Sequence, residues 1–333
     1  MKDRIKSGLF FLLYYSGLER LLARFIRVRG VAVLMYHGVC DQATMPPEIN
    51  FHLPREVFVR EMRALKVRYR VIPLSGLVAA LASGEVPEKS LVLTFDDGYR
   101  NNATLAAPVM KQLGLTATVF VTTACVDSGR WMPLNQVYWL WSEGKLTGDE
   151  MKEYRRQLRT MPASAAAEIL AKLPAGPDRV SEAAHESFAM LSWDEIREMS
   201  KAGFEFGSHT HTHCNMAVED EASQSSQLET SKRLLEQHLG APPTLFAYPY
   251  GRTAQMSEAS RRNVIKAGYR CAISAEYGLV SSGADLFSLP RLGYDRRIWM
   301  FCGEILYQFA KQALRDLWCG FTGRAKTQNA LAK

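Results

Sequence analysis

Short apolar runs alternate with stretches of helical hydrophobic spacing over most of the chain. Residues 31–36 and 91–95 are apolar runs suited to buried strands, whereas residues 54–68 repeat apolar side chains at the spacing of an amphipathic helix. Strands and helices that alternate at these lengths predict βαβ units and a parallel sheet. We therefore expect an α/β fold.

This alternation is interrupted between Cys125 and Leu191. Helical spacing at residues 148–159 and an alanine-rich stretch at 163–173 predict a mostly helical insertion over about residues 126–191. Long excursions on the rim of an α/β scaffold often shape the substrate site. The sequence indicates no chemistry for this insertion.

Asp96 and Asp97 directly follow the predicted strand 91–95 and precede Gly98. Two neighbouring carboxylates do not belong in a dry interior, because uncompensated buried charge is costly. They fit a strand that emerges into a cleft holding a cation, where Gly98 lets the backbone turn. The alternative is an ordinary Asp-Asp-Gly turn.

Three histidines alternate at positions 209, 211 and 213, after a short predicted strand at 204–207. A continued strand would put all three on one face, and a helical loop would align His209 with His213. Either geometry brings His209 and His213 together. Two imidazoles and a strand-end carboxylate predict a divalent metal site, a ligand set that non-haem Fe(II) oxygenases share. The second aspartate of the pair, which the metal site does not need as a ligand, favours hydrolysis, because metal-assisted attack by water needs a base.

Three motifs resemble those of the polysaccharide deacetylases (NodB-homology domain, carbohydrate esterase family 4) in order and approximate spacing. They are Thr-Phe-Asp-Asp-Gly at 94–98, His-Thr-x-x-His at 209–213 and Tyr-Pro-Tyr-Gly at 248–251. The resemblance covers about residues 31–295 outside the insertion. It implies a distorted, incomplete (β/α) barrel and metal-dependent removal of N-acetyl groups from amino sugars of a polysaccharide or glycan precursor.

The resemblance also implies roles for single residues. Asp96 matches the catalytic base of the family, and Asp97, His209 and His213 match its metal ligands. Zinc is the expected ion, although cobalt, nickel or manganese suits the same ligands. We expect the backbone N–H of Tyr250 to stabilise the oxyanion together with the metal.

Two positions depart from the family pattern. Many members orient the base with an arginine in the third motif, where this chain has Ala247. We expect Arg291 to replace it, because a guanidinium can hold a carboxylate by two hydrogen bonds; a surface salt bridge is the alternative. Many members also place an acid histidine in a late Leu-x-His motif, and no histidine follows residue 238. Residues 34–37 resemble a circularly permuted branch of the family, which makes His37 the expected acid.

Composition and charge narrow the class of protein further. The 47% of apolar and 23% of charged residues describe an ordinary globular chain. The net charge of +7 comes without a basic block or a recognition motif, so we expect no nucleic-acid partner. Six scattered cysteines without a Cys-x-x-Cys pair argue against a disulfide framework and a thiolate zinc site, and predict reduced thiols.

The first 28 residues have a different character. An apolar run at 8–18 is flanked by lysines and arginines. Eleven helical residues reach only about 16 Å, well short of a ~30 Å hydrocarbon core, and no small-residue cleavage site follows the run. We expect residues 1–28 to form an amphipathic helix in the membrane interface. A helix packed on the domain is the alternative.

The expected organisation is therefore a membrane-interface helix (1–28), a deacetylase barrel (29–299), and a C-terminal helix with a basic tail (300–333). The expected location is cytoplasmic, at the inner face of the inner membrane. One alternative function is deformylation or deacetylation of a lipid-linked sugar at the inner leaflet. Another is a non-catalytic glycan-binding module, which the replacement of either aspartate or either outer histidine would favour; all four are present.

Overall fold

A computed structural model describes residues 2–41, 51–128, 130–173 and 187–322. Its centre is a barrel of seven parallel strands, which closes because β1 pairs with both β10 and β5. A short strand, β4 (Arg70–Val71), joins the start of β5 outside this ring. The seven are β1 (Val31–Tyr36), β5 (Ser90–Phe95), β6 (Thr118–Val121), β7 (Glu205–Ser208), β8 (Leu245–Ala247), β9 (Cys271–Tyr277) and β10 (Leu289–Gly293). Seven strands in place of eight confirm the predicted α/β fold with an incomplete barrel.

β1 and β8 are continuous apolar runs because both of their faces are buried. In β1, Val31 and Val33 lie in the barrel interior, whereas Ala32, Leu34 and Tyr36 pack under the surrounding helices. Every residue of β5 is buried in the same way. Polar side chains therefore cluster where these strands end.

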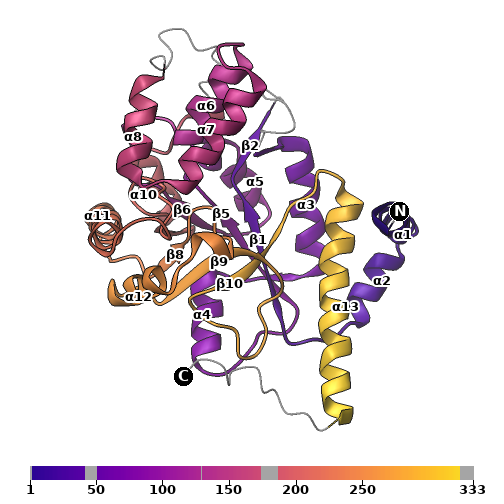
Figure 1. Cartoon of the computed structure of the whole chain (residues 1–333). Helices are drawn as coiled ribbons and strands as arrows, with labels where there is room; N and C mark the ends of the chain where they lie inside the picture. Colours follow the sequence, from indigo (N-terminus) through magenta and orange to yellow (C-terminus); the bar gives the residue numbers. More distant parts are fainter. Residues whose placement is uncertain (1, 42–50, 129, 174–186, 323–333) are drawn as a thin grey trace.

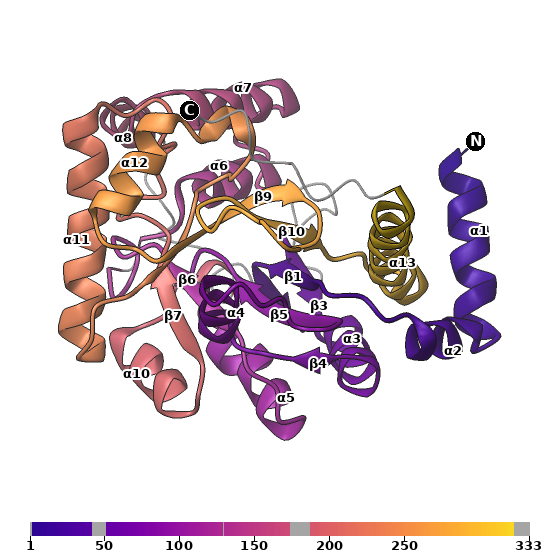
Figure 2. The same cartoon turned by 90° about the horizontal axis from the view of Figure 1, so that it is seen from below.

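Helices surround the barrel and close its lower end (Figure 2). The outer helices are α3 (Arg55–Arg68), α5 (Ala107–Gln112) after a π-helical turn at Asn102–Ala106, α10 (Trp193–Lys201), α11 (Glu221–Leu239), α12 (Glu258–Lys266) and α13 (Ile298–Thr322). Leu74, Leu77 and Val78 of α4 (Leu74–Ala82) pack in the barrel interior. Because α4 blocks the N-terminal end of the strands, ligands can reach the barrel from the opposite end.

The insertion is mostly helical, as predicted, and stands above the carboxyl ends of the strands (Figure 1). It contains α6 (Pro133–Ser142), α7 (Gly148–Thr160) and α8 (Ala163–Lys172). Tyr138 and Trp139 of α6 pack with Met151 and Leu158 of α7 in a separate hydrophobic cluster. Residues 174–186 of the predicted insertion lie outside the described part of the chain, as does the basic tail at 323–333.

The N-terminal segment forms two helices, α1 (Lys2–Tyr15) and α2 (Leu18–Phe25), in place of the single helix expected. The chain bends between them because Gly17 takes a left-handed conformation with φ of 76°, which glycine adopts readily. One face of α1 packs against α13: Phe10 is buried, and a side chain at Gly303 would overlap its ring. No helix among the described residues is both long and apolar enough to span a bilayer.

Candidate active site

The two aspartates follow β5 directly and are separated by a sharp turn of the backbone. Asp97 and Gly98 both have positive φ, 73° and 85°. The turn directs the Asp96 side chain toward Arg291 and the Asp97 side chain toward the histidines. Left-handed φ is uncommon for residues other than glycine, although aspartate adopts it more readily than most.

His209 and His213 come together in a loop that is neither of the two geometries expected from the sequence. β7 ends at Ser208, and Thr210 and His213 take positive φ of 63° and 60°. The two rings lie 4.9 Å apart between centroids. His211 points elsewhere, with its Nδ1 2.9 Å from Oγ1 of Thr123.

The nitrogen of His209 that faces Asp97 is fixed by hydrogen bonding. Nδ1 of His209 donates to the carbonyl of Ala247 at 2.8 Å, which leaves Nε2 as the free lone pair. Nε2 of His209 and Nε2 of His213 lie 3.6 and 3.4 Å from Oδ1 of Asp97. Ligand atoms about 2.1 Å from a tetrahedral zinc ion lie about 3.4 Å apart, so the distances of the two nitrogens from Oδ1 fit a shared ion.

The charges of these groups also fit a cation. Burial lowers the pKa of both His209 and His213, so their imidazoles are neutral and can act as ligands. Burial, followed by the charge of Asp96, raises the pKa of Asp97 to about 8. The protein itself therefore provides too little positive charge beside the Asp97 carboxylate, and a divalent ion would supply it.

Arg291 holds Asp96 by two hydrogen bonds. Its Nη1 and Nη2 donate to the two carboxylate oxygens at 2.8 and 2.7 Å, and its Nε donates to the carbonyl of Ser274. The side chains of Arg291 and Asp96 are 1% and 4% exposed, so the alternative of a surface salt bridge is wrong. Burial by itself would raise the pKa of Asp96, but Arg291 and then His209 hold it well below the usual range. Asp96 is therefore ionised at neutral pH.

His37 lies directly after β1, near Asp96. Burial lowers its pKa to about 4, although the Asp96 charge opposes the shift, so the resting imidazole is neutral at pH 7. Its Nδ1 is enclosed and has no hydrogen-bond partner among the described residues. The side-chain amide of Asn102 donates to the His37 carbonyl at 2.9 Å and holds the backbone there.

Tyr250 links the barrel rim to the insertion. It takes a positive φ of 62°, its ring packs against His213 at 4.8 Å between centroids, and its hydroxyl donates to the carbonyl of Leu158 in α7. The sequence predicted a role for its backbone N–H alone. The side-chain contact with α7 was not predicted, because it depends on how the insertion folds back over the rim.

Tyr99 and Asn135 are site residues that the sequence analysis missed. The hydroxyl of Tyr99 lies close enough to the Asp97 carboxylate to lower its pKa against the effect of burial. The same hydroxyl donates to Oδ1 of Asn135 in α6 at 3.2 Å and accepts from its Nδ2 at 3.0 Å. All three side chains are buried. The insertion thus helps to orient one of the candidate metal ligands. No sequence pattern relates Tyr99 to a residue 36 positions away.

Tyr99→Phe is therefore expected to weaken zinc binding by roughly 10- to 100-fold, the usual cost of losing a partner of a metal ligand. Competition against a chromogenic chelator measures this change. Tyr138→Phe is the matched control, because the buried Tyr138 hydroxyl has no partner among the described residues. Equal zinc affinities for the Tyr99→Phe variant and the unchanged protein would remove Tyr99 from the site.

Comparison with known proteins decides the family. Residues 83–272, more than half of the chain, match the family model for polysaccharide deacetylases. The chain belongs to the polysaccharide deacetylase family. The matched segment contains Asp96, Asp97, His209 and His213, and it leaves His37 and Arg291 outside.

Individual relatives agree with this assignment. The protein YxkH of Bacillus subtilis (strain 168), named for a polysaccharide deacetylase, is 22% identical over 262 residues, which cover 78% of this chain and 70% of YxkH. The deacetylase PplD of Streptococcus pyogenes, solved with acetate, matches at a TM-score of 0.58 and 20% identity, over 84% of this chain and 98% of PplD. IcaB from Ammonifex degensii matches at a TM-score of 0.55 and 19% identity, over 84% of this chain and 97% of IcaB. These likenesses confirm a barrel of the NodB type, and the family indicates a hydrolase that acts on amide bonds.

Proposed function

We propose that the protein is a metal-dependent hydrolase that removes N-acetyl groups from amino sugars of a glycan. The observation that carries this proposal is the juxtaposition at the barrel rim. Asp97, His209 and His213 offer ligand atoms that all lie within 4.8 Å of one another, and the ionised Asp96 stands beside them, held by Arg291. Family membership supports the reaction class.

Each residue then has a defined task. A divalent cation held by Asp97, His209 and His213 would polarise the amide carbonyl and acidify a water molecule. Asp96, oriented by Arg291, takes a proton from the attacking water. The backbone N–H of Tyr250 donates to the oxyanion that develops on the carbonyl oxygen.

The proton must then reach the leaving amine. Because Arg291 keeps the pKa of Asp96 low, Asp96 retains this proton only weakly. His37 is neutral in the resting site, and it lies close enough to Asp96 for the carboxylate charge to act on its pKa. His37 therefore receives the proton from Asp96 and delivers it to the nitrogen of the leaving amine. The C–N bond breaks, and acetate and a free amine leave without a covalent intermediate.

Zinc-loaded protein is expected to release acetate when incubated with N-acetylated glucosamine oligomers, either free or carried on an isoprenoid diphosphate. Enzymatic detection of acetate, with a parallel detection of formate from N-formyl analogues, measures the reaction. Release from the lipid-linked substrate alone would favour the inner-leaflet alternative. Tight oligomer binding without any released acid would contradict the hydrolase and leave a glycan-binding module.

We further propose that α1, α2 and α13 form a face that binds anionic lipid at the cytoplasmic side of the inner membrane. Most of the exposed large apolar side chains of the described chain lie on these three helices, which sit side by side in both views (Figures 1 and 2). Lysines and arginines of α1 and α2 are interspersed with them and complement anionic headgroups. The exposed apolar residues are Ile5, Leu9, Phe11, Leu12, Tyr15, Leu18, Leu21, Leu22, Phe25, Tyr307, Leu314, Leu317 and Trp318.

The full chain is therefore expected to float with vesicles containing phosphatidylglycerol, and less with vesicles of phosphatidylcholine alone. Leu9→Glu combined with Leu12→Glu should abolish flotation, because both side chains are more than half exposed on α1. Ile265→Glu is the control, since Ile265 is an exposed apolar residue on α12, across the barrel. Unchanged flotation of the double variant would reject this face as the membrane contact.

A further inference from the structure

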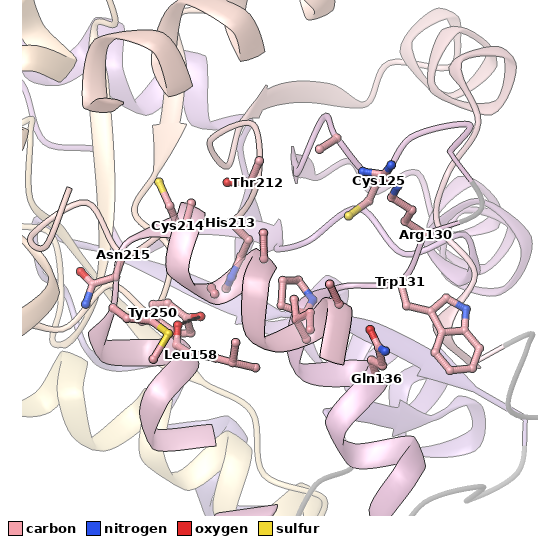
Figure 3. A pocket seen from close by; sticks show the side chains of 18 residues that line it. Cys125, Arg130, Trp131, Gln136, Leu158, Thr212, His213, Cys214, Asn215 and Tyr250 are labelled. Atoms are coloured by element: carbon pink, nitrogen blue, oxygen red, sulfur yellow. Dashed lines mark hydrogen bonds between the residues drawn. The ribbon is translucent and has the colours of Figure 1, made fainter. Parts of the chain in front are cut away.

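A cavity of about 720 Å³ lies between the insertion and the barrel rim (Figure 3). His213 and Tyr250 line one side of it, and Trp131 and Gln136 line the other. The candidate metal site therefore opens into this cavity. Its volume falls in the range of small-molecule binding sites, and it is far larger than an acetyl group requires.

The wall that α8 contributes is apolar. The residues of α8 that face the cavity recur at the spacing of one helical stripe, and they are Ala163, Ala166, Ala167, Leu170 and Ala171. Leu158 and Met161 extend this wall. Ala166 and Leu170 are half-buried against the α6/α7 cluster, whereas Ala167 and Ala171 are exposed, and no residue of α8 is fully buried. The stripe therefore remains accessible from the cavity.

Polar groups lie at the opposite edge of the cavity, close to the metal site. Thr212 and Asn215 flank His213 in the loop after β7. The hydroxyl of Thr212 is enclosed without a hydrogen-bond partner among the described residues. The cavity is therefore amphiphilic: hydrogen-bonding groups lie at the reacting end and, as Arg130 and Gln136, on the side of Trp131, whereas hydrocarbon lines the wall along α8.

An apolar wall does not favour a second sugar residue, because a buried hydroxyl without a partner costs free energy. A hydrocarbon chain gains free energy there, by roughly 0.8 kcal/mol for each buried methylene, equivalent to about fourfold in affinity. We propose that the cavity binds a hydrocarbon chain carried by the amino-sugar substrate. This inference rests on the proposed function and specifies its substrate class.

The chain can come from two sources, an N-acyl group longer than acetyl or a lipid attached at the anomeric carbon. Isothermal titration of the full-length zinc protein with N-octanoylglucosamine, octyl N-acetylglucosaminide and N-acetylglucosamine separates them. At least one octyl compound is expected to bind 10- to 100-fold more tightly than N-acetylglucosamine, and the tighter one identifies the source. Equal affinities for all three would overturn the inference.

Substitutions on α8 test where the chain binds. Ala166→Phe fills the cavity from the stripe and should remove the advantage of the octyl compound without changing zinc content. Ser164→Phe is the matched control, because Ser164 is exposed on α8 and does not line the cavity. An octyl advantage that persists in the Ala166→Phe variant would also overturn the inference.

Failure of this inference is distinguishable from failure of the proposed function. Acetate release from short N-acetylated sugars, with no effect of chain length on binding, would leave the hydrolase and reject the hydrocarbon site. Chain-dependent binding that Ala166→Phe abolishes, with no acid released from any compound, would support the site and reject the hydrolase.

Discussion

Replacing His209 with alanine is expected to release the metal ion and reduce amide hydrolysis to background. His209 is one of three candidate ligands. Its Nδ1 donates to the Ala247 carbonyl, so Nε2 is the atom available to a metal ion, and alanine offers no replacement for it. The affinity should fall by more than the ~100-fold that loss of a supporting residue costs. Metal content after gel filtration, measured by plasma mass spectrometry, should fall from one zinc per chain to nearly none.

His211→Ala is the matched control for this experiment. His211 belongs to the same loop, but its Nδ1 lies 2.9 Å from the hydroxyl oxygen of Thr123. It is not one of the three candidate metal ligands. This variant should keep one zinc per chain. Retention of a full zinc complement by the His209→Ala variant would show that the ligand assignment is wrong. Chelator treatment followed by reloading with zinc, cobalt, nickel or manganese identifies which ion supports turnover.

The sequence was informative where one physical requirement dominates. An apolar run that ends in Asp96 and Asp97 has to lead from a buried strand into a polar site, and the structure has β5 end at Phe95. The run at 31–36 matches β1 for the same reason. Arg291 could be suggested because a buried carboxylate needs a bidentate partner, and the structure brings its guanidinium to Asp96.

Other features depend on contacts that no local pattern encodes. Positive φ at Asp97, Thr210 and His213 is imposed by the packed rim, so the loop after β7 could not be predicted from strand or helix periodicity. The contribution of the insertion to the site could not be predicted from the sequence either. Tyr99 and Asn135 meet because α6 folds over the end of β5, and Tyr250 meets α7 in the same way. These contacts join segments that are far apart in the sequence.

Asp96→Asn is expected to keep the metal and to lower the rate of hydrolysis by roughly 10²–10⁴. The amide retains the shape of the carboxylate but cannot accept the proton of the attacking water. Arg291 would lose its buried charge partner, so the variant should also be less stable, by as much as about 3–5 kcal/mol if the pair is fully broken. Zinc content and thermal unfolding, measured beside the rate, separate lost chemistry from lost folding.

Asp97→Asn is the contrasting variant, because it should lose zinc as well as activity. Near-normal turnover by the Asp96→Asn variant would remove Asp96 as the base.

The Arg291→Lys variant adds a test of pH dependence. Lysine keeps the positive charge but cannot hold both carboxylate oxygens, so the pKa of Asp96 should rise from its depressed position. Since the base works when ionised, the acidic limb of the pH–rate profile should move to higher pH. An acidic limb at the same pH in both proteins would mean that it does not report Asp96.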